Sequence, residues 1–163
     1  PTGDAFGAVS DLTTGETFGS ELFTGWTNDG DGASYGSWGS FSYDAGTNIA
    51  TASDSDANDT FKTSFTSESD AVYRVSFTTG SSTSGAIYFR FLANANSLEG
   101  FSCSPVLSRG YFGNDNSFIF YTKATASGTK YCGFRSSGTD LAITVKNFSI
   151  KKVTSSGNIG LLI

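Results

Sequence analysis

The chain has 163 residues, a formal net charge of −5, and neither histidine nor methionine. Without histidine it lacks the commonest general base and the commonest neutral metal ligand, which excludes Ser-His and Cys-His nucleophile pairs and most hydrolase mechanisms. Serine, threonine and glycine fill 66 positions, which favours strands and turns over helices, while 15 phenylalanines, 7 tyrosines and 2 tryptophans supply material for a core.

Residues 1–20 show neither helical nor strand periodicity. Their few apolar side chains are widely spaced, so the segment cannot bury itself. We predict an extended N-terminal arm that contacts a neighbouring subunit through Phe6, Val9 and Leu12.

From residue 21 onward, short runs of alternating apolar and polar residues recur about every 8 to 14 residues, separated by Gly, Asn, Asp or Ser. This pattern is typical of an all-β, antiparallel sandwich. We predict a single such domain over residues 21–153. The expected strands cover residues 21–24, 33–44, 48–52, 60–66, 71–79, 86–93, 99–104, 117–124, 130–136 and 140–153.

The last expected strand changes its buried face along its length. Its apolar residues occupy odd positions as far as Val145 and even positions from Phe148 onward. Because side chains alternate between the two faces of a strand, one residue near Lys146 or Asn147 must be extra. This predicts a β-bulge, or a kink between two sheets.

Residues 154–163 begin as a Gly- and Ser-containing linker and end in an apolar hook. Burying an aliphatic side chain contributes roughly 1.5 to 3 kcal/mol of free energy, and a monomer that left the hook in water would not gain this stabilisation. We predict a C-terminal tail that inserts Ile159, Leu161, Leu162 and Ile163 into a partner.

Charge is divided along the chain, since residues 1–70 hold 12 acids and one base whereas residues 71–163 hold 3 acids and 9 bases. Aspartates that bond locally in turns explain much of this division. The alternative is an acidic face that meets a basic face on a neighbouring copy. The bases are scattered singly, so we expect no nucleic-acid partner, and no apolar run approaches the roughly 20 residues that span a bilayer, so we expect no membrane contact.

Two acidic loops offer hard oxygen ligands for a structural calcium ion, and no other cofactor is expected. Asp29 and Asp31 lie in the first loop, and Asp54, Asp56 and Asp59 lie in the second. Neither loop has the closing glutamate of an EF-hand. Solvated acidic turns are the alternative.

The two cysteines, Cys103 and Cys132, lie in separate strand-like segments. We expect two buried thiols rather than a disulfide. Pro1 with no methionine elsewhere fits an intact cytoplasmic product whose initiator was removed, and a trimmed fragment is the alternative.

Two aromatic segments are candidates for ligand contact. Trp38 breaks the alternation within SYGSWGSFSY (34–43), so it is the best candidate for an exposed ring on which a sugar could stack, with Tyr35 beside it. Tyr111 and Phe112 form a second aromatic pair in a loop, where such pairs often contact a ligand or a subunit.

The segments ELFTGWTNDGDG (21–32), DAVYRVSFTT (70–79) and KYCGFRSSGTDLAITVKNFSIKKV (130–153) resemble the carbohydrate-binding-module-like jelly rolls of tailed-bacteriophage virion proteins. The matching features are a Gly-Trp pair, a Tyr-x-Val-x-Phe core and an Asn-x-Ser-x-x-x-Val ending. They occupy Gly25, Trp26, Tyr73, Val75, Phe77, Asn147, Ser149 and Val153. The resemblance covers residues 21–153 and implies a jelly-roll β-sandwich whose relatives serve as capsid decorations, head fibres or tail-fibre domains.

We therefore predict a non-enzymatic bacteriophage virion structural protein, assembled in the host cytoplasm. A capsid decoration, or cement, protein that grips the shell by its arm and tail fits best, and a homotrimer would suit a three-fold capsid position. The alternative is a carbohydrate-binding module or host-glycan adhesin that binds surface glycans. A paired-carboxylate glycosidase is the one enzyme class left, and it would need acids placed rigidly on strands rather than in turns.

Overall fold

The structure is a computed structural model that describes residues 15–30, 36–83, 87–92, 103–104 and 112–155. Within these ranges the chain forms strands and no helix, so nothing helical there could cross a membrane. In chain order the strands are β1 (Thr17–Glu21), β2 (Ser40–Asp44), β3 (Ile49–Ser53), β4 (Thr60–Ser67), β5 (Val72–Ser82), β6 (Ile87–Leu92), β7 (Cys103–Ser104), β8 (Ser117–Ala124), β9 (Gly128–Ser136) and β10 (Ile143–Ser155).

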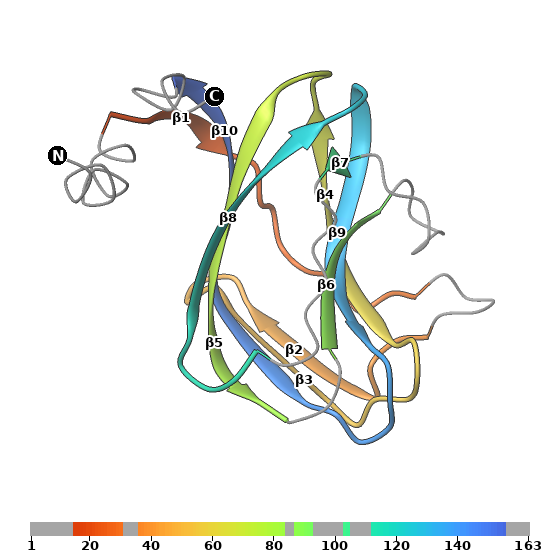
Figure 1. The fold of residues 1–163 in the computed structure, drawn as a ribbon. Coiled ribbons are helices and arrows are strands. Elements are labelled where there is room, and N and C mark those ends of the chain that lie inside the picture. Colours follow the sequence, from red (N-terminus) through yellow and green to blue (C-terminus); the bar gives the residue numbers. More distant parts are fainter. Residues whose placement is uncertain (1–14, 31–35, 84–86, 93–102, 105–111, 156–163) are drawn as a thin grey trace, which may run out of the picture.

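The strands pair antiparallel into two sheets that face each other (Figure 1). The larger sheet has the order β2-β3-β10-β5-β8-β7, and β1 joins it by pairing with β10. The smaller sheet has the order β4-β9-β6. The predicted all-β, antiparallel sandwich is therefore confirmed.

Aromatic rings from both sheets fill the space between them. The ring of Phe77 on β5 lies 5.2 Å from that of Phe134 on β9 and 5.8 Å from that of Phe89 on β6, measured between centroids. Phe61 on β4 stacks on Phe134 at 5.2 Å. Each such pair adds about 0.5 to 1.5 kcal/mol beyond the area it buries. The interlock fixes the inward face of each strand, and it confirms the predicted alternation in β5 and β6.

The predicted irregularity in the last strand is a β-bulge. Between Lys146 and Ser149 the chain advances three residues along β10, while their partners Thr78 and Ser76 lie only two apart on β5. The extra residue is Asn147, whose φ of 54° lies in the left-handed region, where asparagine is better tolerated than most residues. Beyond the bulge, Phe148 and Ile150 turn their side chains back into the core.

The first strand begins inside the segment predicted as an extended arm, residues 1–20. Phe18 pairs with Val153 of β10, which itself continues to Ser155. The guanidinium of Arg74 lies 5.1 Å from the centre of the Phe18 ring, and the Tyr121 hydroxyl donates to Oε2 of Glu16 at 2.7 Å. Glu16 and Phe18 thus contact side chains on the outer face of the larger sheet. Phe18 is the one apolar residue of β1, so the sequence of this strand shows no alternation. Backbone pairing with β10 and the contact between Phe18 and Arg74 hold the strand in place.

Some predictions fall outside the described residues and stay predictions. They include the apolar contacts of the arm and tail, at Phe6, Val9, Leu12, Ile159, Leu161, Leu162 and Ile163. Cys132 is buried at the centre of β9, whereas nothing is described of the Cys103 side chain, so the state of the two thiols is not tested.

The bulge gives a direct test of this register. Replacing Asn147 by valine should lower the free energy of unfolding by about 1 to 2 kcal/mol, because a β-branched residue is strained at positive φ. Asn147→Gly should remain close to the wild type, since glycine adopts this conformation readily. Urea unfolding measures both. Equal stability of the valine variant and the wild type would show that the bulge is placed wrongly.

Candidate functional site

Trp38 is not exposed, so the prediction that its ring is available for stacking is wrong. It is only 2% exposed, its Nε1 donates to the carbonyl of Phe134 at 3.4 Å, and its ring lies 6.0 Å from that of Phe61. The strand predicted over residues 33–44 begins only at Ser40. Residue 38 broke the strand alternation because it belongs to a loop that inserts its indole into the core.

A side-chain clasp holds this loop in place. The Asn28 amide donates to the Trp38 carbonyl at 2.9 Å, and its oxygen accepts from the Trp38 backbone N–H at 2.8 Å. Tyr35 lies between the clasped residues but outside the described part of the chain.

Phe112 is also a core residue. It is 3% exposed, and its ring lies 5.3 Å from that of Phe118 and 5.7 Å from that of Phe134. The predicted ligand contact at this position is therefore wrong, because the loop folds its aromatic side chain inward. Tyr111 lies outside the described residues.

In the first acidic loop, the one predicted ligand that the structure describes lies beside a cation. Oδ2 of Asp29 lies 3.7 Å from Nζ of Lys62, so an ammonium group occupies its neighbourhood. Asp31 lies outside the described residues. Among the residues that are described, no group of three or more acidic or cysteine side chains could hold a metal ion.

The second acidic loop uses its carboxylates to fold itself. Oδ2 of Asp59 accepts from the backbone N–H of Asp56 at 2.6 Å, and the Ser136 hydroxyl accepts from the backbone N–H of Asp59 at 3.1 Å. Asp59 is 6% exposed, and the backbone of Gly36 packs directly against its carboxylate. Burial raises the pKa of Asp59, which the hydrogen bond from Asp56 partly opposes and the charge of Asp56 reinforces.

The sandwich presents two outer faces, and on that of the larger sheet Glu16 and Phe18 contact Tyr121 and Arg74. The Tyr121 hydroxyl is bonded to Glu16, and burial together with this bond raises the pKa of Tyr121 to about 12. Nε of Arg74 and Oε1 of Glu16 are closed off from solvent. The aromatic and charged groups of this face thus hold β1 on the sheet.

The outer face of the smaller sheet carries partly exposed aromatic and cationic side chains. Register places Arg135 opposite Tyr88, Gly133 opposite Arg90, and Tyr131 opposite Leu92. Strand β4 continues the same rows with Thr60, Lys62 and Ser64. We call the four residues Tyr88, Arg90, Tyr131 and Arg135 the Tyr/Arg face; each is partly exposed.

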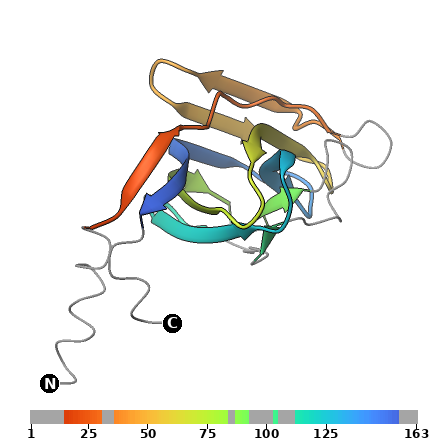
Figure 2. The ribbon, with the colours of Figure 1, turned by 90° about the horizontal axis from the view of Figure 1, so that it is seen from above.

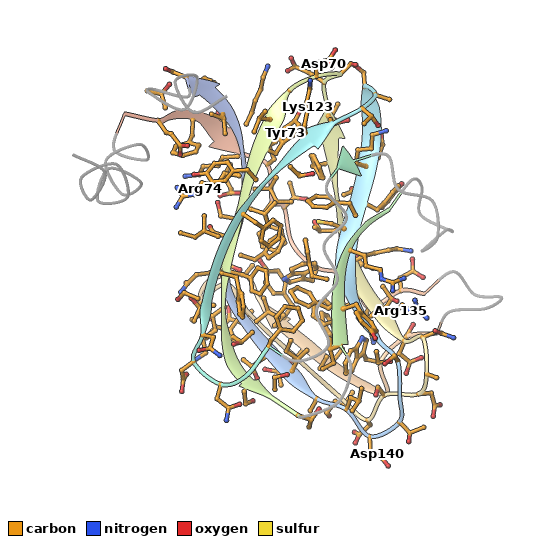
Figure 3. The ribbon with its side chains drawn as sticks, viewed as in Figure 1. Asp70, Tyr73, Arg74, Lys123, Arg135 and Asp140 are labelled. Carbon is orange, nitrogen blue, oxygen red and sulfur yellow. The ribbon has the colours of Figure 1, made fainter. Side chains whose placement is uncertain are left out.

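Contacts within the sheet orient these groups. The guanidinium of Arg90 lies 4.9 Å from the centre of the Tyr88 ring, a cation–π distance. Nε of Arg135 donates to Oδ1 of Asn58 at 3.0 Å. Gly133 allows β4 to approach closely, since a Cβ there would lie 3.1 Å from Cα of Lys62 and would collide with the Phe61 carbonyl. Figure 3 shows Arg135 and Arg74 on opposite outer faces of the sandwich.

Lys62 anchors the edge of this face. Its backbone exchanges two hydrogen bonds with Thr27, and its Nζ donates to the carbonyl of Gly30 at 3.4 Å. The loop after Thr27 is thereby held beside β4. Lys62 is 7% exposed as a result.

None of the four residues of the Tyr/Arg face was a candidate from sequence. The signal was present, because Tyr88 and Arg90 stand on the polar face of AIYFRFL, opposite Ile87, Phe89 and Phe91.

No protein-family model matches the chain, and no curated protein matches it in sequence. Solved structures similar in fold include a CBM4 module, with 13% identity and a TM-score of 0.46 over 70% of this chain and 76% of that chain. Another is the mannan-binding module from Man5C, with 17% identity and a TM-score of 0.38 over 70% and 91%. A third is the enzymatically active domain of tailspike protein 4 of bacteriophage CBA120, with 12% identity and a TM-score of 0.43 over 90% and 20%.

The buried indole predicts a purely structural effect of substitution. Trp38→Ala should lower the free energy of unfolding by about 3 to 5 kcal/mol, the usual result of emptying an aromatic core position. Trp38→Phe should recover part of the loss. Denaturant unfolding measures both, and a fully stable alanine variant would place the ring outside the core.

The buried carboxyl predicts a pH effect. A carboxyl whose pKa is raised by folding holds its proton more tightly in the folded state, so its contribution to stability is present below about pH 3.8 and is lost as pH rises through the folded pKa. Asp59→Asn should therefore lose less stability than the wild type between about pH 4 and pH 7.

Thermal midpoints measured across that range test the expectation. Asp115→Asn, in an exposed turn, is the matched control and should follow the wild type. An Asp59→Asn curve parallel to the wild type would mean that the carboxyl is solvated.

Proposed function

We propose that this chain is a non-catalytic glycan-binding domain that holds its ligand on the Tyr/Arg face. The observation that carries the proposal is the placement of two partly exposed tyrosines on the neighbouring strands β6 and β9, with Arg90 at a position between them and Arg135 opposite Tyr88. Sugar rings offer apolar C–H faces to aromatic rings and hydroxyls to polar groups, so this combination of side chains fits them on both counts.

Each group has a role in such a complex. Tyr88 and Tyr131 would contact the sugar rings, while Arg90 and Arg135 would donate to hydroxyl or ring oxygens. Asn58 holds the Arg135 side chain in position. Because the groups stand on a hydrogen-bonded sheet rather than on a loop, little conformational freedom is lost on binding.

The spacing favours a chain of sugars over a single one. Tyr131 lies four residues beyond Arg135, which is the partner of Tyr88 on the adjacent strand. With a rise of about 3.4 Å per residue and a strand spacing of about 4.8 Å, the two tyrosines stand roughly 14 Å apart at their Cα atoms. A single sugar ring cannot contact both.

The virion role is a second proposal, supported by one feature of the fold. Thr17 pairs with Ser155, so the first and last strands of the sandwich lie next to each other. Figure 2 shows β1 and the end of β10 projecting together from one side. Two terminal segments that start side by side can grip one neighbouring surface. That corner belongs to the larger sheet, whereas the Tyr/Arg face belongs to the smaller one. A domain fastened to a virion by its ends would present the glycan-binding surface outward.

Tyrosine substitutions test the binding face. Tyr88→Ala and Tyr131→Ala should each weaken binding to a polysaccharide that the wild type retains by about tenfold, which corresponds to roughly 1.4 kcal/mol of lost ring contact. Affinity electrophoresis across a panel of soluble polysaccharides, followed by calorimetry, gives the measurement.

Tyr121→Ala is the matched control, because this tyrosine stands partly exposed on the other sheet. It should bind as the wild type does. If Tyr121→Ala abolishes binding while Tyr88→Ala and Tyr131→Ala leave it intact, the proposed face is wrong.

A further inference from the structure

The larger sheet ends at β2, whose outer edge is open. This strand pairs with β3 over all five of its residues and stands last in the strand order. No described residue forms a backbone hydrogen bond with β2 on its other side. In Figure 2 the β2–β3 hairpin lies at the rim of the molecule. Because every second residue of an edge strand points its N–H and C=O groups away from the sheet, β2 offers a row of unpaired groups.

Other strand edges are covered by segments of the chain itself. On β4, the backbone of Lys62 exchanges hydrogen bonds of 2.8 and 2.9 Å with Thr27, and the Thr60 N–H donates to the Gly36 carbonyl at 2.9 Å. The second half of β10 is paired with β1. In the part of the chain that the structure describes, β2 has no such cover.

The sequence of β2 lacks the usual protection of an edge strand. Protected edges carry a lysine, a proline, a bulge or an inward-pointing charge. This strand reads SFSYD and pairs with β3 without a register shift. Its one charged residue, Asp44, is exposed at the end of the strand. Phe41 and Tyr43 pack against the core, so the strand is held in the sheet while its edge stays open.

We propose that two copies of this chain pair through β2, antiparallel and about a two-fold axis at Ser42, so that their larger sheets join into one. The axis places Ser42 opposite its own copy. It also places Phe41 opposite Tyr43 of the other copy, and Ser40 opposite Asp44. An aromatic pair and a hydroxyl beside a carboxylate are favourable cross-strand neighbours, and no like charges meet. Both aromatic residues are partly exposed, and pairing would cover more of their surface.

The pairing would also orient the two copies. Residues opposite each other on paired strands point to the same side of a sheet. Because Phe41 and Tyr43 point inward, both smaller sheets would lie on the same side of the joined sheet. A dimer whose smaller sheets bind glycan as proposed would hold a polysaccharide at two places and gain avidity. The pairing itself does not depend on that function.

Cysteine cross-linking tests the position of the axis. Antiparallel neighbours stand about 4.5 to 5.5 Å apart at their Cα atoms, a separation that a disulfide can bridge. Ser42→Cys should therefore give a covalent dimer under aerobic oxidation. Thr51→Cys, also exposed but on β3, should not, because three strand spacings of about 4.8 Å would separate the two copies of residue 51. The wild type controls for the native cysteines.

Sedimentation equilibrium of the full chain measures the association itself. A contact between five-residue strands is small, so we expect a dissociation constant between about 10 µM and 1 mM for the wild type. Ser42→Lys should weaken the association about tenfold, since two lysines would face each other across the axis. Thr51→Lys should leave it unchanged. Urea unfolding of both variants at low concentration checks that each is folded.

Three results would overturn the proposal. The first is a wild type that stays monomeric up to about 1 mM. The second is a dimer that Ser42→Lys leaves intact and that Ser42→Cys does not cross-link, because another surface would then join the copies. The third is equal cross-linking through Ser42→Cys and Thr51→Cys, which would show that the contact has no fixed register at β2.

Discussion

The phenylalanine rings that interlock between the two sheets are the contact on which the rest of the structure depends. Phe61, Phe77, Phe89, Phe134 and Phe148 come from five different strands and meet at centroid distances of 5.2 to 6.4 Å. Because side chains alternate along a strand, fixing these rings inward sends their immediate neighbours outward. The outward position of Tyr88, Arg90 and Arg135 is therefore a consequence of the core.

The two sheets use their outer faces differently. On the larger sheet, Arg74 and Tyr121 are engaged by Phe18 and Glu16, so the polar groups there stabilise the first strand. On the smaller sheet, Arg90 contacts Tyr88 within the same strand, and no described segment of the chain is held there by the pair. The same residue types thus stabilise the first strand on one side and, in the function that we propose, contact the ligand on the other.

Much of the fold could be predicted from sequence, because period-two alternation and turn residues are local signals. The extra residue at Asn147 could be located because Val145 and Phe148 disagree in parity. The β1 strand could not be predicted, since it pairs with residues of β10 that lie 130 or more positions away. The exposure of Trp38 was predicted wrongly for a related reason. Trp38 lies in a loop, where alternation does not indicate burial, and its position in the core goes with hydrogen bonds to the distant Asn28.

The candidate site was missed because its residues lie on different strands. Tyr88 and Arg135 are 47 positions apart and become neighbours only through the β6–β9 register. A glycine-rich aromatic segment is conspicuous in a sequence, whereas a face assembled by strand pairing is visible only once the order of strands is known. If the cationic and aromatic residues of each expected strand had been assigned to its inward or outward face, the basic residues of β4, β6 and β9 would have stood apart from the acidic turns.

The glycan that we propose as the ligand would bind on the outer face of β4-β9-β6. Backbone amide shifts of the isotope-labelled chain, followed by NMR while an oligosaccharide of a retained polymer is added, test it most directly. The largest shifts should fall on Tyr88, Arg90, Tyr131 and Arg135. Shifts confined to Arg74, Ile119 and Tyr121 on the larger sheet would contradict it.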